Sequence, residues 1–299
     1  MRWIELVAAA LHVFSAIFGA FLKVMVVIFL PICLVESVIV GRMNAASLAL
    51  QTFTEMTNMT DVHMEQMLVV LKQLLTNEML LYAVTLFLHP VGAIAVAKMA
   101  KQYIDGEEVQ AGKAMSEALT NMPAILITGL LFGLLVILGS LVIVPGVYFG
   151  IAWGLYQYVI GFEGKSGWEA LRSSKKLVDG KWLRTFGYMF ILGSIAMLWN
   201  SIFSLTCSFL GDSTAASLLY DFLCYISVGF VAVGEAMLYL NRKAVAEGAC
   251  VFDTGFINDP SPVDMPAEPV EGVVEGTAEE KTEEVAGLIE EKKDKNENK

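Results

Sequence analysis

Long apolar runs without charge alternate with short polar segments over most of the chain. Residues 118–162 carry no charged side chain across 45 consecutive positions. One bilayer crossing takes about 20 apolar helical residues, and a helix keeps its backbone hydrogen-bonded where water is absent. Pro145-Gly146 interrupt the run, which is long enough for two crossings. We therefore expect a helical hairpin with spans at 123–143 and 147–162.

Further stretches reach the length of one crossing. The expected spans lie at 19–40, 79–97, 185–207 and 217–240. Glu78 and Lys98 bound the second of them, and the first and last each contain two charged residues. The pattern predicts an all-α, polytopic membrane protein with about six transmembrane helices.

Lys and Arg are divided unevenly between the two sides of this predicted membrane domain. The segments between the spans alternate between the two sides of the membrane. Those on one side carry twelve Lys and Arg residues, and those on the other carry only Arg42 and Lys72. Short cytoplasmic loops carry the excess of Lys and Arg. Both termini should therefore be cytoplasmic, and 41–78 should form the largest external loop, with a helix over 60–76 lying on the outer surface. The first apolar stretch is too long for a signal peptide.

An amphipathic segment precedes each predicted hairpin on the cytoplasmic side. The most pronounced is 168–182, where apolar and basic side chains fall on opposite sides of a helix, and Ser166 and Glu169 have the spacing of a capping box. The N-terminal residues and 107–120 show weaker versions. Such helices lie at lipid headgroups, where basic side chains meet anionic lipid. The residues expected to contact lipid or a partner there are Trp168, Arg172, Lys175, Lys176, Lys181, Trp182 and Arg184.

Composition separates a hydrophobic body, 1–252, from an acidic tail, 253–299. The chain is 56% apolar and 17% charged, and the tail holds 14 of its 31 acids but only 5 of its 20 bases. The body is thus nearly neutral, which argues against a nucleic-acid binder. The tail has too little apolar surface to fold, so we expect a disordered segment. The alternative is a docking site for a cytoplasmic protein.

His89 is the candidate for an intramembrane polar site. It lies near the middle of its span beside Pro90, where a kink frees a backbone carbonyl. Ionisable residues at membrane depth are functional candidates by default. Lys23, Glu36 and Glu235 are expected near the membrane surfaces, so no second carboxylate is expected at the depth of His89. A histidine satisfied within the packed helices is the simpler interpretation, and a proton-relay or ligand role is the alternative.

Small residues recur at four-residue spacing in the predicted hairpin. Such residues let helix backbones approach closely in lipid. We expect them to pack within the hairpin or bundle, with a dimer face, and hence a homo-oligomer, as the alternative. The glycines concerned are Gly129, Gly133, Gly146, Gly150 and Gly154.

No catalytic motif stands out. The segment Gly164-Lys165-Ser166 matches the last three residues of the phosphate-binding loop motif. The motif also needs a glycine at position 159, where this chain has Val159. Cys207 and Cys224 flank the last external turn, and either a disulfide or two buried thiols would fit. The scattered histidines form no metal-binding motif. The sequence therefore predicts no enzyme activity, cofactor or metal.

Residues 144–190 nevertheless resemble a known family. The segments that carry the resemblance are Val144-Pro145-Gly146-Val147-Tyr148, Glu163-Gly164-Lys165-Ser166-Gly167, Ala170-Leu171-Arg172-Ser173-Ser174, Leu177-Val178 and Lys181-Trp182. They resemble a family of poorly characterised bacterial six-span membrane proteins that includes the membrane domain of some glycerophosphoryl diester phosphodiesterases. The resemblance implies a bacterial cytoplasmic (inner) membrane location and no established activity for the membrane part. The phosphodiesterase chemistry belongs to a soluble barrel, which 243–299 are too short to form.

Two functions follow from these observations as hypotheses. The first is a non-enzymatic membrane protein that organises lipid, or scaffolds a partner, through its basic interfacial helices. The second is a transporter or lipid-handling permease, in which Pro31, His89-Pro90 and the paired glycines break helices around a binding site.

Overall fold

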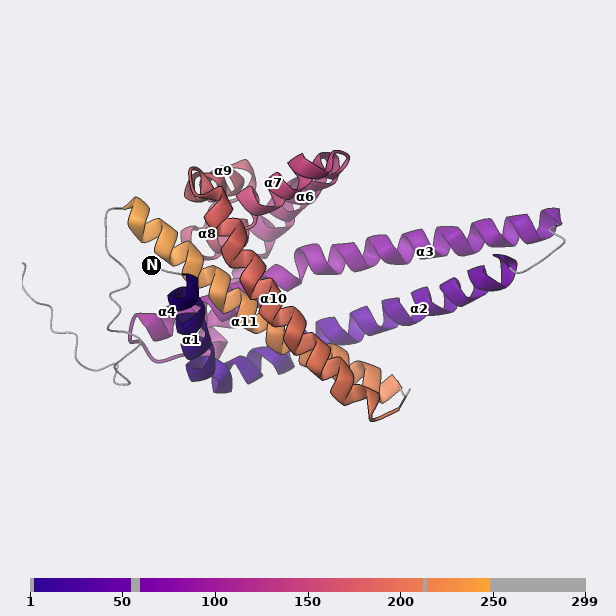
Figure 1. The fold of residues 1–299 in the computed structure, drawn as a ribbon, viewed down its shortest axis with the longest axis horizontal. Helices are drawn as coiled ribbons and strands as arrows, with labels where there is room; N and C mark the ends of the chain where they lie inside the picture. Colours follow the sequence, from indigo (N-terminus) through magenta and orange to yellow (C-terminus); the bar gives the residue numbers. More distant parts are fainter. Residues whose placement is uncertain (1–2, 55–59, 212–213, 248–299) are drawn as a thin grey trace, which may run out of the picture. The chain divides into compact units, whose positions relative to one another are not determined.

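The computed structural model describes residues 3–54, 60–211 and 214–247, and every regular element in these ranges is a helix (Figure 1). In chain order they are α1 (Trp3–Val24), the π-helical turn η1 (Met25–Phe29), α2 (Leu30–Thr54), α3 (Asp61–Phe87), α4 (His89–Ile104), α5 (Ala111–Thr120), α6 (Met122–Ser140), α7 (Ile143–Trp153), α8 (Tyr156–Glu163), α9 (Gly167–Val178), α10 (Trp182–Ser208) and α11 (Thr214–Ala246). The prediction of an all-α protein is confirmed. The tail 253–299 and its docking alternative lie outside the described residues.

The first helical stretch bends sharply at η1. Figure 1 shows α1 and α2 running in different directions on either side of this turn. π-helical turns and prolines are the usual causes of kinks, and Pro31 lies two residues after the end of η1. The predicted span 19–40 therefore straddles the bend and is not one straight helix. Hydropathy did not show this, because the bend lies inside an apolar run.

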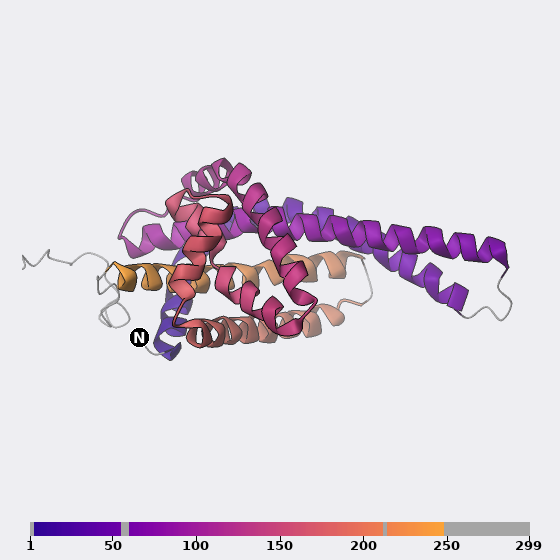
Figure 2. The same cartoon turned by 90° about the horizontal axis from the view of Figure 1, so that it is seen from above.

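Helices α2 and α3 run side by side as a long antiparallel pair (Figures 1 and 2). Most of 41–78, predicted as an external loop, belongs to these helices. A helix over 60–76 was predicted correctly, but it continues to Phe87 instead of lying as a separate surface element. Thr60 starts it, since its hydroxyl accepts a hydrogen bond from the His63 amide while the His63 ring accepts one from the Thr60 amide.

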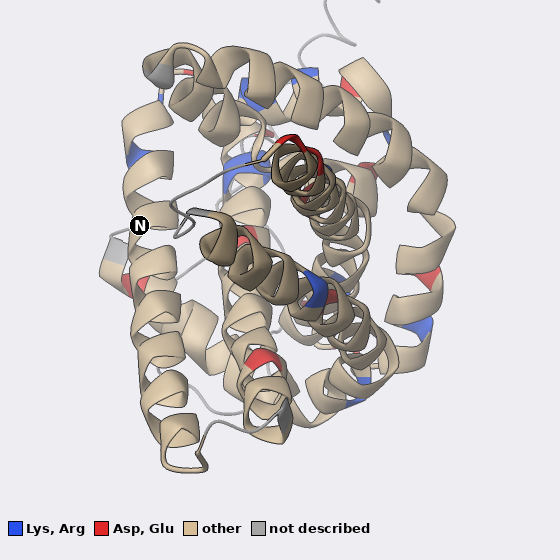
Figure 3. Cartoon of the chain, turned by 90° about the vertical axis from the view of Figure 1, so that its right-hand side faces the viewer, with Lys and Arg blue, Asp and Glu red and all other residues tan. Residues whose placement is uncertain are grey.

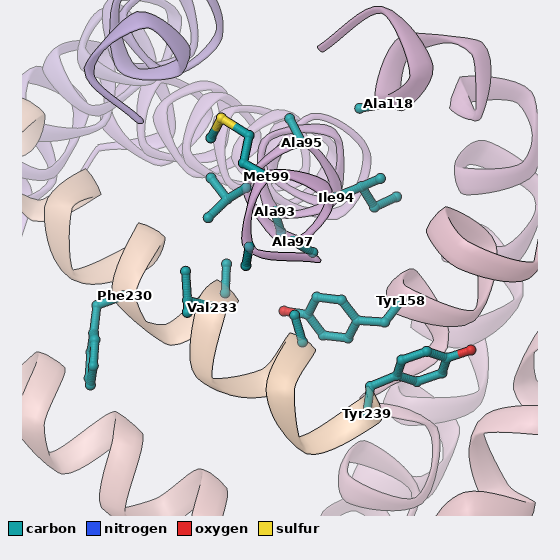
Figure 4. Packing of buried hydrophobic residues seen from close by; sticks show 14 of the residues in the cluster. Ala93, Ile94, Ala95, Ala97, Met99, Ala118, Tyr158, Phe230, Val233 and Tyr239 are labelled. Atoms are coloured by element: carbon teal, nitrogen blue, oxygen red, sulfur yellow. The ribbon is translucent and has the colours of Figure 1, made fainter. Parts of the chain in front are cut away.

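Helix α4 lies at the centre of the packed region. Its small residues, including Ala93, Ala95 and Ala97, are buried between neighbouring helices (Figure 4). Small side chains let α1, α8 and α11 approach this helix closely. The core therefore forms around α4, while the far part of the α2–α3 pair extends away from it (Figure 1).

The predicted hairpin 123–162 is only partly confirmed. Helix α6 matches the span at 123–143, but the span at 147–162 is broken into α7 and α8 at Gly154-Leu155. Neither piece is long enough for a full bilayer crossing, which takes about 20 residues. Apolar composition marked the segment but could not show that its backbone is interrupted.

Five helical stretches are long and apolar enough to cross a membrane: Ile4–Phe53, Asp61–Ile104, Met122–Ser140, Trp182–Ser208 and Ala215–Ala246. Their outer surfaces are strongly apolar. In α10, only 11% of the most apolar window is buried within the protein, and Figure 3 shows few charged residues along the helices. Such apolar surface is stable in lipid and not in water. The protein is therefore membrane-embedded.

Candidate functional site

Three polar side chains from distant parts of the chain meet beside the break between α3 and α4. His89 Nε2 lies 2.8 Å from Glu36 Oε1, and the Tyr225 hydroxyl donates to Glu36 Oε2 at 2.5 Å. The same hydroxyl lies 3.2 Å from His89 Nε2. The expectation that no carboxylate accompanies His89 is wrong, because α2 brings Glu36 to its ring. We call these residues the Glu36 cluster.

Local backbone chemistry places His89 in this cluster. Leu88 interrupts the helix, and His89 and Pro90 begin the next one. Pro90 has no N–H with which to continue the hydrogen bonding of α3, so the helix breaks there. Phe29 of η1 stacks on the Tyr225 ring, with centroids 4.8 Å apart. Both helix irregularities therefore border the cluster.

A second polar group surrounds Glu235 of α11. The Tyr158 hydroxyl donates to Glu235 Oε2 at 2.9 Å, and Gln157 Nε2 donates to the same oxygen at 3.4 Å. Both donors come from α8, which begins after the break at Gly154-Leu155. In Figure 4 the hydroxyls of Tyr158 and Tyr239 point in opposite directions, the first to Glu235 and the second to Glu163. We call Glu235, Tyr158 and Gln157 the Glu235 cluster.

One cavity of about 520 Å³ has residues of both clusters in its wall. His89 and Glu235 line it from opposite clusters, together with Asn200 and Ser227, which are hydrogen-bonded to each other at 2.7 Å. The rest of the wall is mainly apolar or aromatic. Tyr82 and Thr85 of α3 also line the cavity and are exposed, so it is open along α3. The volume and lining are typical of a small-molecule site.

An ion-pair network lies near the C-terminal end of α8. Glu163 pairs with Lys165 at 2.7 Å and Lys243 at 3.2 Å, and accepts a hydrogen bond from Tyr239 at 2.5 Å. Burial opposes ionisation of Glu163, but these hydrogen bonds and the charge of Lys243 outweigh it and hold its pKa below the ordinary value. The hydrogen bond to Glu163 in turn raises the pKa of Lys165. The network joins α8, its following turn and α11.

The predicted interfacial segment forms α9, with a buried and an exposed side. Leu171 and Val178 are buried, while Arg172, Lys175 and Lys176 are exposed. The capping box is absent: Ser166 makes no capping hydrogen bond through its side chain, and the Gly167 amide donates instead to Thr128 of α6 at 2.7 Å. Thus a hydroxyl from another helix accepts a hydrogen bond from one of the free amides at the start of α9.

The remaining interfacial candidates flank α9. Trp168 is 57% exposed and meets Trp153 edge to face. Trp182 stacks on Phe186, with the two rings nearly parallel, and its indole donates to the Tyr148 carbonyl at 3.4 Å. Lys181 is partly buried, and Arg184 is exposed. The exposed basic residues leave a charged surface beside two tryptophans.

The five candidate glycines have different surroundings. A Cβ on Gly129 or Gly133 would meet Leu86 of α3, so these two face another hairpin. A Cβ on Gly146 would meet Ser140 at 2.8 Å, inside the α6–α7 turn. At Gly154 it would meet the Gly150 carbonyl at 2.8 Å, at the helix break, whereas Gly150 itself has nothing within 4 Å. The five glycines therefore do not form one common packing face.

The sequence did not show that Glu235, Gln157, Asn200 and Tyr225 surround or adjoin one cavity. A partial signal exists in α11, where Ser227, Val231 and Glu235 recur every four residues and all line the cavity. The partners on other helices lie far away in the chain, and local spacing carries no information about them. In the described ranges, Cys33, Cys207 and Cys224 are free thiols, and no group of three or more potential ligand side chains is placed to hold a metal ion.

Comparison of the chain with protein-family models, curated proteins and solved structures found no match.

Proposed function

We propose that this protein is a non-enzymatic, lipid-handling permease of a bacterial cytoplasmic membrane. The observation that carries the proposal is that two broken helices and a carboxylate surround one open cavity. His89 and Pro90 lie at the first break, and Gly154 and Tyr156 lie at the second. Glu235 lines the same cavity from α11. Broken helices around a polar site are the usual construction of transporter binding sites.

The position of the opening favours lipid over a water-soluble substrate. Tyr82 and Thr85, at the open wall, fall in the predicted span 79–97 and in the apolar stretch Asp61–Ile104. A lipid headgroup reaching the cavity from the side would meet Glu235, Asn200 and Ser227, while its chains would stay against apolar helix surfaces. The family resemblance supports the bacterial location, and the Lys and Arg distribution supports cytoplasmic termini.

Transbilayer movement of labelled lipid in proteoliposomes tests this function. We expect the protein to accelerate the loss of fluorescence when dithionite quenches phosphatidylethanolamine labelled on its acyl chain. Ala196→Phe places a ring in the cavity wall and should abolish most of this acceleration. Ala45→Phe is the matched control on an exposed face of α2, and it should leave the rate unchanged. Equal rates with protein, with Ala196→Phe and with empty liposomes would contradict the proposal.

Lipid organisation at the cytoplasmic face is a second candidate, favoured by the exposed basic side of α9. Near an anionic membrane surface each Lys or Arg contributes about 1 kcal/mol of attraction. Replacing Lys175 and Lys176 with Gln should therefore reduce the anionic lipid retained on purification, as mass spectrometry would show. The matched control is the double variant Arg42→Gln and Lys72→Gln, at exposed positions of α2 and α3 that are expected on the opposite side of the membrane. Unchanged lipid retention would exclude this role for α9.

A further inference from the structure

The carboxylates that join helices differ in whether a cationic partner is present. Glu117 bonds Lys98 at 2.7 Å, Glu163 pairs with Lys165 and Lys243, and Glu36 lies against His89. Glu235 instead receives hydrogen bonds from a tyrosine and a glutamine. In the described part of the chain, no Lys or Arg forms an ion pair with Glu235 or lines its cavity.

Because Glu235 lacks a positive partner among the described residues, the charge of a ligand should affect how well the cavity binds it. A carboxylate removed from water is stabilised in its charged form by a positive partner and by hydrogen bonds to its oxygens. Tyr158 and Gln157 provide hydrogen bonds to one oxygen, Oε2, and no positive charge. A ligand that carries a positive charge would complete the site, whereas an anionic ligand would meet like charge.

His89 also lines the cavity and could carry a positive charge, but it does not change this conclusion. Its Nε2 faces Glu36 and the Tyr225 hydroxyl, so a proton on the ring is balanced within the Glu36 cluster. Glu36 is not part of the cavity wall. The charge that the cavity presents to a ligand is therefore that of Glu235.

Aromatic rings add a second feature that attracts cations. Phe132, Tyr156 and Tyr158 line the cavity, and the rings of Phe132 and Tyr156 lie 4.9 Å apart. The face of an aromatic ring attracts a cation, and quaternary ammonium groups are commonly bound against clustered aromatic rings. The wall of Val228, Val231 and Ala232 suits an apolar body attached to the charged group.

We propose that the cavity binds the ammonium group of an amphiphilic organic cation or a lipid headgroup, held by Glu235 and the rings of Phe132 and Tyr156. This inference rests on the proposed permease function and names its substrate class. The shared chemistry is an ammonium group on a molecule that also has an apolar part. A free cation and an aminophospholipid both provide it, so the test has one arm for each.

The first arm measures choline binding in nanodiscs of phosphatidylglycerol, which has no amino group. 3,3-Dimethylbutanol is the control, because it has the same shape without the charge. We expect choline to bind and the alcohol not to bind. Glu235→Gln, which retains the hydrogen-bond acceptor but removes the charge, should weaken choline binding about ten- to hundredfold. Glu65→Gln, on the exposed side of α3, should leave it unchanged.

The second arm compares lipids retained by protein purified from equal amounts of phosphatidylethanolamine and phosphatidylglycerol. Enrichment of phosphatidylethanolamine that is lost in Glu235→Gln would assign the site to a headgroup. Choline binding without such enrichment would assign it to a free cation. Equal binding of choline and its neutral analogue, or no binding of either ammonium compound, would overturn the proposal, as would unchanged binding in Glu235→Gln.

The two proposals can fail separately. Lipid movement that Ala196→Phe abolishes, combined with no preference for ammonium compounds, would leave the permease function standing and overturn the substrate class. Ammonium binding that depends on Glu235, without any lipid movement, would support the binding site and contradict the permease function. Tyr158→Phe provides a further check, since loss of one hydrogen bond to Glu235 should alter choline affinity less than Glu235→Gln does.

Discussion

Glu36 and Glu235 both accept a hydrogen bond from a tyrosine hydroxyl between helices, yet their surroundings differ. Glu36 also meets His89, and the side chains of this pair are 20% and 26% exposed. Glu235 meets Gln157 and opens into a cavity that, among the residues the structure describes, has no Lys or Arg in its wall. The comparison teaches that two glutamates can have different roles. The contacts of Glu36 are completed within the protein, whereas Glu235 leaves room for a ligand.

The largest expected difference is in stability. Glu36→Gln removes the charge that faces His89, and we expect it to lower the free energy of unfolding by about 2 kcal/mol. Glu235→Gln should cost much less, because the described partners of Glu235 are the neutral side chains of Tyr158 and Gln157. Thermal unfolding in detergent, followed by tryptophan fluorescence, measures both. If Glu235→Gln lowers the midpoint as much as Glu36→Gln, the distinction between the clusters is wrong.

A smaller effect should separate two glycines near the second helix break. Gly154→Ala would place a Cβ 2.8 Å from the Gly150 carbonyl, so the break must shift, at a cost of about 1–2 kcal/mol. Gly150→Ala meets nothing within 4 Å and gains helix propensity, so it should be neutral or stabilising. The same unfolding assay compares them. Equal behaviour of the two variants would mean that the break does not depend on close approach at Gly154.

The smallest expected effect concerns pH and a third carboxylate, Glu163. Its pKa in the folded protein lies below the ordinary value of 4.5, so the folded state favours the ionised form. The resulting stabilisation is complete above pH 4.5 and is lost as pH falls through the folded-state pKa. Glu163→Gln should therefore flatten the decrease in the unfolding midpoint below pH 4.5. An unchanged acid profile would show that Lys165 and Lys243 do not stabilise the ionised carboxylate.

Much of the helical content could be predicted from the sequence, because apolar length reports directly on bilayer crossing. The predicted spans 123–143, 185–207 and 217–240 fall within α6, α10 and α11, apart from a few residues at one end. The ends of the helices were harder to predict from the sequence. Hydropathy indicates which residues can lie within the membrane, but it does not indicate where the helical hydrogen bonding ends. For this reason α2 and α3 extend well into the segment predicted as a loop.

The interruptions and the site could be predicted only in part. Pro90 indicated a break at His89, but nothing comparable marks the interruption at Gly154-Leu155 inside an apolar run. His89 could be chosen because an ionisable group at membrane depth stands out. Its partner Glu36 lies 53 residues away, and Gln157 reaches Glu235 across 78 residues. Pairings over such distances depend on how whole helices pack, which local patterns do not determine.

The charge preference of the cavity can be measured most directly through a single thiol in its wall. In a variant without the native cysteines, Ala196→Cys would place the thiol beside the cavity, for modification by cationic and anionic methanethiosulfonate reagents of similar size. With rates normalised to those of free cysteine, we predict that the cationic reagent is favoured about tenfold and that adding Glu235→Gln abolishes the preference. Equal normalised rates before that substitution, or a preference that survives it, would contradict a cavity whose charge comes from Glu235.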